Sequence, residues 1–223
     1  MSTIAERLTA LKAEIPDGIG LVAVSKFHPV GALMDAYGAG QRRFGESRVQ
    51  ELLRKQDEMP SDVEWHFIGH LQTNKVRSLV GRTALIESID SEHLLECVDR
   101  ESERAGVVSR VLMQVHVAAE ETKFGFDPEE LLDYFASRRF EALKATHICG
   151  VMGMASNTDD ESRVSADFAR IAEIFRDIRG RVAPDLRGFD LLSMGMSGDW
   201  PLAVAQGANL IRVGTRIFGP REY

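Results

Sequence analysis

The sequence predicts one parallel (β/α)8 barrel, an α/β fold of the TIM-barrel type, with an extra helix at the N-terminus. Eight short apolar or β-branched runs recur along the chain, which is the number of strands that such a closed barrel needs. The segments between these runs have helical periodicity, which favours a parallel sheet with right-handed crossovers. The length of 223 residues also lies within the roughly 200 to 250 residues of one such barrel.

The individual elements follow from local patterns. The first segment, MSTIAERLTALKAEI, mixes charged and apolar residues at helical spacing, so it predicts a helix and not a signal peptide. Farther along, Ser91 can cap a helix that Gly106 ends, and the segment 159–179 is the longest helical stretch. The predicted strands cover residues 19–26, 42–46, 64–69, 83–90, 109–118, 146–154, 189–196 and 209–219.

We predict a single domain over residues 1–223, because no linker or low-complexity segment interrupts the pattern. An open, doubly wound sheet is the alternative fold. It is less favoured because the first strand leads into SKFHP and not into the GxGxxG motif of a Rossmann fold.

Composition excludes several classes of partner. With 44% hydrophobic and 27% charged residues, the chain has the balance of an ordinary soluble domain. Its net charge of −7 repels phosphate backbones and acidic lipid surfaces, so we expect neither nucleic acid nor membrane as a partner. Cys97 and Cys149 lack any metal-binding spacing and are predicted to be free buried thiols, so no metal site is predicted. A cytoplasmic location is expected.

Lys26 is the main candidate for chemistry. It follows the apolar run 19–24, which places an amine at the carboxyl end of a buried strand, where barrels bind their ligands. Burial disfavours the ammonium form and so raises the fraction of neutral amine, which can attack an aldehyde to form an imine. The alternative is a lysine that extends from the strand end into solvent.

The last two predicted strands indicate a phosphate site. Barrels commonly bind phosphate with the loops after strands seven and eight. Glycines and a serine follow the seventh strand before a predicted helix, and after the eighth Gly214 allows a close backbone approach while Thr215 offers a hydroxyl. Ser193 and Thr215 are the candidate phosphate ligands. The alternative is that the glycines only turn the chain and Ser197 only caps a helix.

Arg212 lies between two apolar residues of the last strand and needs an anionic or acceptor partner, either a salt bridge or a cofactor atom. His66 could face a cofactor or be a core histidine. Four methionines alternate along two strands and are expected to line the core, namely Met152, Met154, Met194 and Met196.

Seven motifs, in this order and spacing, resemble the pyridoxal 5′-phosphate (PLP) homeostasis protein family, also known as YggS/PROSC-like proteins: AVSKFHP, FGESRVQE, WHFIGHLQTNK, SIDS, KFGF, LSMGMSGDW and IRVGTRIFG. The resemblance implies the barrel of alanine racemase, PLP fold type III, standing alone. It further implies PLP as a Schiff base on Lys26, a phosphate held by Ser193 and Gly214-Thr215, and Arg212 at the pyridine nitrogen.

The resemblance also implies positions for residues around the cofactor and at the barrel mouth. Met194 belongs to the LSMGMS run and is expected beside the cofactor, and Asn74 in the LQTNK run is expected at the barrel mouth with Lys75. Lys123 is a candidate for a second amine near the cofactor. The chain departs from the family at Ser47 and His116, where asparagine is common, so neither residue receives a role.

For function, the resemblance implies a protein that binds PLP reversibly, acts in intracellular PLP homeostasis and delivers PLP to apo PLP-dependent enzymes. The alternative is a PLP-dependent racemase or decarboxylase, which needs a second acid/base and a closed site. Of the three tyrosines, Tyr37 and Tyr134 fall in helical segments and Tyr223 is the last residue. We therefore predict a monomeric carrier that is not an enzyme. A phosphosugar barrel with an aldolase-like Lys26 would leave Arg212 unexplained.

Overall fold

The computed structural model of the protein describes residues 2–118 and 124–220. It contains a closed barrel in which each strand is hydrogen-bonded to the next and the last pairs with the first, and all pairings are parallel. The strands are β1 (Gly20–Val24), β2 (Arg43–Glu46), β3 (Glu64–Phe67), β4 (Leu85–Ile89), β5 (Ser109–Gln114), β6 (Thr146–Met152), β7 (Leu191–Ser193) and β8 (Leu210–Val213). The predicted TIM-barrel fold is confirmed.

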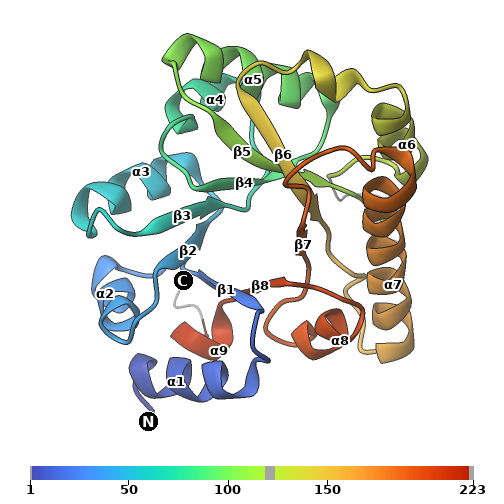
Figure 1. Cartoon of the computed structure of the whole chain (residues 1–223). Coiled ribbons are helices and arrows are strands. Elements are labelled where there is room, and N and C mark those ends of the chain that lie inside the picture. Colours follow the sequence, from blue (N-terminus) through green and yellow to red (C-terminus); the bar gives the residue numbers. More distant parts are fainter. Residues whose placement is uncertain (1, 119–123, 221–223) are drawn as a thin grey trace.

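Helices surround the barrel on the outside (Figure 1). They are α1 (Ile4–Glu14), α2 (Val30–Gly38), α3 (Val49–Glu58), α4 (Thr73–Leu79), α5 (Glu92–Ala105), α6 (Pro128–Ala136), α7 (Glu161–Asp177), α8 (Trp200–Ala205) and α9 (Thr215–Phe218), with short helical turns η1 (Arg139–Ala142) and η2 (Ile178–Val182). The additional N-terminal helix α1 packs against α2 and α9, beside the seam where β1 meets β8.

Local signals in the sequence set several boundaries. The hydroxyl of Ser91 accepts a hydrogen bond from the Leu94 N–H at the start of α5, and Gly106 ends that helix with a φ of 67°. The predicted helix in 159–179 is α7, the longest in the described part of the chain with 17 residues. Cys97 and Cys149 are buried and free, as predicted.

Several predicted strands are longer than the observed ones, and the last of them differs most in its structure. The run 209–219 forms β8 only as far as Val213, because the backbone then turns at Gly214 and the N–H groups of Ile217 and Phe218 donate to the Gly214 carbonyl. The segment Thr215–Phe218 is therefore the short helix α9. Ile217 and Phe218 in this segment are buried, and a short apolar run does not by itself distinguish a buried strand from a buried helix.

Two separate cores follow from the alternation of side chains along each strand. A small cluster fills the barrel interior: Val22, Leu85, Leu112, Cys149, Met152 and Leu210. A much larger cluster lies between the strands and the helices. Glu87 and Arg212, two positions after Leu85 and Leu210 of this inner cluster, also face inward, nearer the carboxyl ends of β4 and β8. In the described residues, no helix combines the length and apolar character needed to cross a bilayer.

Candidate functional site

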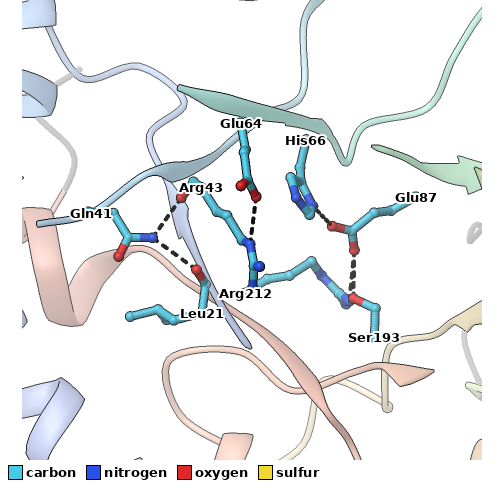
Figure 2. Close-up of polar contacts among 8 residues, drawn as sticks. All are labelled: Leu21, Gln41, Arg43, Glu64, His66, Glu87, Ser193 and Arg212. Carbon is cyan, nitrogen blue, oxygen red and sulfur yellow. Dashed lines mark hydrogen bonds and ion pairs between the residues drawn. The ribbon is translucent and has the colours of Figure 1, made fainter. Parts of the chain in front are cut away.

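A buried polar layer lies on the inner face of the barrel, beyond the small apolar cluster and toward the carboxyl ends of the strands. Figure 2 shows four of its residues, His66, Glu87, Ser193 and Arg212. Glu87 from β4 is its centre and is fully buried. His66 from β3 contacts Glu87 with 2.6 Å between Nδ1 and Oε1, and the Ser193 hydroxyl from β7 donates to Oε2 at 2.6 Å. Both carboxylate oxygens of Glu87 are therefore hydrogen-bonded.

Arg212 from β8 completes this layer. Its Nη1 donates to Ser193 Oγ at 2.5 Å and lies 3.6 Å from Glu87 Oε2, while Nη2 donates to the Gly153 carbonyl at 3.0 Å. The guanidinium is only 4% exposed. Burial lowers the pKa of Arg212, and the negative charges of Glu87 and Asp199 raise it by less than burial lowers it. A guanidinium nevertheless stays protonated in proteins. Arg212 is thus a buried cation held from two sides.

Glu87 supplies the opposite charge. Burial by itself raises its pKa, but the hydrogen bond from His66 and the charges of His66 and Arg212 outweigh burial and hold the pKa below its ordinary value. The carboxylate is therefore ionised at neutral pH, and His66 Nδ1 carries the proton that it donates to Glu87. In this buried layer, the negative charge of Glu87 therefore lies beside the positive charge of Arg212.

Sequence reasoning missed Glu87, although it found three of its neighbours. A signal was present, because Glu87 lies two residues after Leu85, which faces the barrel interior, and an acidic residue on an inward strand position needs a partner. The identity of that partner was not visible, since Ser193 lies 106 residues away along the chain.

Lys26 lies at the carboxyl end of β1. Val22 faces the barrel interior, so alternation places Val24, the last residue of β1, on the same inner face, and Lys26 follows two residues later. Lys26 is half-buried and occupies a tight turn in which the His28 N–H donates to the Ser25 carbonyl at 3.1 Å. The predicted placement of an amine at the mouth of the barrel agrees with this geometry.

The loops after β7 and β8 meet beside that turn. The Gly214 N–H donates to Ser197 Oγ at 3.2 Å, so Ser197 joins the two loops and does not cap α8, which has no side-chain cap. A Cβ on Gly214 would lie 3.1 Å from the carbonyl oxygen of Val24, which shows how closely β8 approaches the strand of Lys26. Thr215, next in the chain, is exposed. The structure thus brings the predicted phosphate loops to Lys26.

Ser193, which the sequence predicts as a phosphate ligand, contacts Glu87 and Arg212 in this structure. Its hydroxyl is fully buried, its single proton is donated to Glu87, and it accepts from Arg212. A hydroxyl has only one proton to donate, so in this arrangement Ser193 has none for an anion. Its contacts make it a support for Arg212.

Two other predicted residues lie away from this layer. Met194 is fully buried in the core between strands and helices, because Ser193 faces inward and the next side chain points to the opposite face. Asn74 is exposed at the start of α4, where it lines a surface groove of about 460 Å³ with His70 and Asp90. Lys123 lies outside the described residues.

Comparisons with known proteins decide the family. The protein-family model described as the alanine racemase N-terminal domain matches residues 1–222. The pyridoxal phosphate homeostasis protein of Schizosaccharomyces pombe is 37% identical over 229 residues, with 99% of this chain and 94% of the relative covered. That of Pseudomonas aeruginosa is 34% identical over 234 residues, with 100% and 98% covered. The chain belongs to the family of pyridoxal phosphate homeostasis proteins. The resemblance carried by the seven motifs is confirmed.

Solved structures agree with this family. PipY of Synechococcus elongatus without PLP is 41% identical and superposes with a TM-score of 0.92, covering 97% of this chain and 100% of PipY. PipY with PLP bound is 40% identical with a TM-score of 0.89 over the same shares. Alanine racemase of Clostridium difficile, with 12% identity and a TM-score of 0.75, shares the fold alone, and this chain covers 55% of its length.

Proposed function

We propose that this protein binds PLP as a Schiff base on Lys26 and acts in intracellular PLP homeostasis and delivery. The observation that supports this most directly is the convergence of three groups at one end of the barrel: Lys26 after β1, the joined loops after β7 and β8, and the buried cation of Arg212. PipY, a relative 40% identical to this chain, has been solved with PLP bound.

The residues present fit PLP in three respects. The backbone approach at Gly214, which a Cβ would obstruct, leaves room for a phosphate beside the Thr215 hydroxyl. Arg212 carries a fixed array of N–H donors that matches an acceptor such as a pyridine nitrogen. Lys26 supplies the amine. When bound, PLP supplies a reactive aldehyde that a neutral amine captures reversibly.

Within this site, we assign each residue a binding role. Thr215 and the backbone around Gly214 bind the phosphate, and Arg212 addresses the ring nitrogen. Glu87 and Ser193 hold Arg212 in place through the contacts described above. We retain Asn74 and Met194 only as outer and supporting positions, because their side chains lie away from the polar layer.

We infer that the protein is a carrier and not a racemase or decarboxylase. A racemase needs two positioned bases, and PLP catalysis needs a site that excludes water. Tyr37 lies on α2 with its hydroxyl bonded to Asp62 at 2.7 Å, and Tyr134 is buried on α6. Both tyrosines are on the outer helices. We further propose a cytoplasmic monomer formed by one domain over 1–223, with apo PLP-dependent enzymes as recipients.

A spectrum and a chemical trap test the binding site. Purified protein mixed with PLP is expected to show a Schiff-base absorbance band, and borohydride is expected to fix the mass of the reduced cofactor on Lys26. Lys26→Ala should lose both signals, whereas Lys144→Ala, which removes an exposed lysine paired with Glu103, should retain them. An adduct found on Lys75 or Lys123 and never on Lys26 would contradict the assignment.

Carrier and enzyme are separated by a transfer assay. The loaded protein should give no more racemised or decarboxylated product from alanine, serine or lysine than free PLP does. Mixed with an apo PLP-dependent enzyme, it should restore that enzyme's activity while its own absorbance band disappears. Stereospecific turnover well above the rate with free PLP, lost in Lys26→Ala, would favour the racemase alternative.

A further inference from the structure

We propose that Lys55, a buried lysine on α3, is a positioning residue that holds the turn carrying Lys26. Its side chain is fully buried, and its ammonium group reaches the backbone just after β1, at the Ser25 carbonyl. This inference deepens the proposed function, since it concerns how the chain presents the amine that we assign to PLP.

Lys55 uses its ammonium group in full. Its Nζ donates to the Ser25 carbonyl at 2.8 Å, to Glu46 Oε1 at 2.7 Å and to Glu51 Oε1 at 2.8 Å. An ammonium group has three protons to donate, and here each has one acceptor. One of the three acceptors is the backbone of the residue immediately before Lys26.

The other side of Lys26 is tied to the same cluster. The Phe27 N–H donates to Glu51 Oε1 at 2.7 Å, and that oxygen also accepts from Lys55. Ser25 is fixed once more, because its hydroxyl donates to Glu46 Oε1 at 2.6 Å. Lys55 therefore joins the residues before and after Lys26 to one helix through two carboxylates.

The turn needs such support because its backbone is strained. Phe27 has a φ of 70°, a left-handed conformation that side chains other than glycine rarely adopt. Strain of this kind persists only where the surrounding structure imposes it, and it is concentrated at functional sites. Here the Glu51 carboxylate and the hydrogen bond from His28 N–H to Ser25 O hold Lys26 and Phe27 at the centre of the turn.

A buried lysine is a poor means of stabilising a fold. Removing two opposite charges from water offsets most of their attraction, and apolar replacements of buried ion pairs are often equally stable. Glu46 illustrates the penalty: burial raises its pKa above the ordinary value, even with Lys55 beside it. What the cluster provides is a defined geometry, because Lys55 binds the Ser25 carbonyl directly and also binds the two carboxylates that accept from Ser25 and Phe27.

The geometry of the turn matters for the covalent step. After the Lys26 ammonium has lost one proton to solvent, the neutral Nζ would add to the aldehyde carbon, with a C–N bond forming as one C–O bond breaks. The two remaining Nζ protons would then leave with the carbonyl oxygen as water, which makes the bond C=N. The attack requires the amine to be held at the correct distance and direction, and a misplacement of about 1 Å can slow such a step by on the order of a hundredfold. Binding of the ring and phosphate depends on β7 and β8 and does not require this alignment.

The experiment therefore measures the two steps separately. Pyridoxine 5′-phosphate has the ring and phosphate of PLP but no aldehyde, so its affinity reports binding alone. In Lys55→Met we expect this affinity to stay within about twofold of wild type, while the rate at which borohydride-trapped adduct forms on Lys26 falls on the order of tenfold to a hundredfold. Arg54→Met, an exposed cation one residue earlier on α3, is the control and should match wild type in both.

A second pair of variants guards against misfolding of Lys55→Met. The Glu51 side chain is 13% exposed, whereas the side chains of Lys55 and Glu46 are fully buried, so Glu51 is the more accessible position of the cluster. Glu51→Gln keeps an oxygen acceptor for the Phe27 N–H and should retain most of the trapping rate. Glu51→Ala removes that acceptor and should slow trapping like Lys55→Met. Circular dichroism confirms that each variant is folded.

The possible results separate this inference from the proposed function. If wild type forms no adduct on Lys26, the proposed function fails, and the positioning role fails with it. If wild type forms the adduct and the folded variants trap at the same rate, only the positioning role is wrong. A parallel loss of pyridoxine 5′-phosphate affinity and trapping rate would also overturn it, because the cluster would then support the whole site and not the turn.

Discussion

The guanidinium of Arg212 lies 3.6 Å from the carboxylate of Glu87, and neither side chain is more than 4% exposed. The two residues come from β8 and β4, which are not neighbours in the sheet, so the contact crosses the interior of the barrel. The Ser193 hydroxyl bridges them, with hydrogen bonds of 2.5 Å to Arg212 and 2.6 Å to Glu87. Each residue therefore offsets the free-energy cost of burying the charge of the other.

We expect Glu87→Gln to lower the free energy of unfolding by about 3 kcal/mol, because the substitution leaves Arg212 as an uncompensated buried cation. Urea unfolding followed by tryptophan fluorescence measures the change. Glu64→Gln is the matched control, since Glu64 pairs with Arg43 on the surface at 2.8 Å and its loss should change stability by less than about 1 kcal/mol. The double variant Glu87→Gln/Arg212→Met should recover much of the loss. Equal effects of Glu87→Gln and Glu64→Gln would refute the buried-pair interpretation.

The stability contribution of Glu87 should disappear in acid. Its pKa in the folded protein is held below the ordinary value of about 4.3, so the unfolded chain takes up a proton first as the pH falls. The contribution is fully present above that ordinary value and is lost as the pH falls through the folded pKa. Urea titrations between about pH 6 and pH 3 should therefore show a smaller loss of stability in Glu87→Gln than in wild type. Parallel curves for the two proteins would contradict this.

Thr215→Val should weaken PLP and inorganic phosphate alike, by about tenfold, because it removes one hydroxyl donor to an anion at nearly constant shape. Thr215 is exposed, so the free energy of unfolding should hardly change. Calorimetric titration of both ligands measures the effect, and Thr9→Val on the exposed face of α1 serves as control. Unchanged affinity in folded Thr215→Val would show that the phosphate binds elsewhere.

Two glycines of the loop after β7 should respond in opposite ways to alanine. Gly195 has a φ of 95°, and a Cβ there would lie 2.9 Å from the Trp200 Cα and 2.7 Å from the Ala203 Cβ. Gly195→Ala is therefore expected to destabilise the protein by about 1 to 3 kcal/mol. Gly198 has open space around it, so Gly198→Ala should be neutral or slightly stabilising. Thermal unfolding checks both, and a tolerated Gly195→Ala would mean that this loop rearranges freely.

Part of the site could be predicted because its signals are local. The apolar run before Lys26 predicted that Lys26 follows the end of a strand. The glycines after the seventh strand predicted a loop there, and Ser197 of this loop accepts a hydrogen bond from the Gly214 N–H. Lys55 shows the limit of such signals. In the run RKQDE it has the pattern of a solvated helix surface, yet it is fully buried because it reaches the Ser25 carbonyl, 30 residues earlier in the chain.

The expectations for Met194 and Ser193 also depended on contacts between residues far apart in the chain, which local patterns do not show. Met194 was expected beside the cofactor because it belongs to the LSMGMS run, but the sequence of a strand does not show which of its two faces points inward. Barrel closure decides which face of β7 points inward, because it brings Ser193 into contact with Glu87 and Arg212 in the interior. Ser193 was expected to donate to a phosphate, but in the structure its hydroxyl donates to Glu87 instead.

The sequence by itself determined the order and number of the strands, the helix limits at Ser91 and Gly106, and the end of the barrel at which Lys26 and the glycine-rich loops lie. These depend on hydrophobic period and on capping, which act over a few residues. Only the tertiary structure decided which charges face one another. Glu87 with Arg212, and Lys55 with the turn at Lys26, are paired by barrel closure and helix packing, which join positions far apart in the chain.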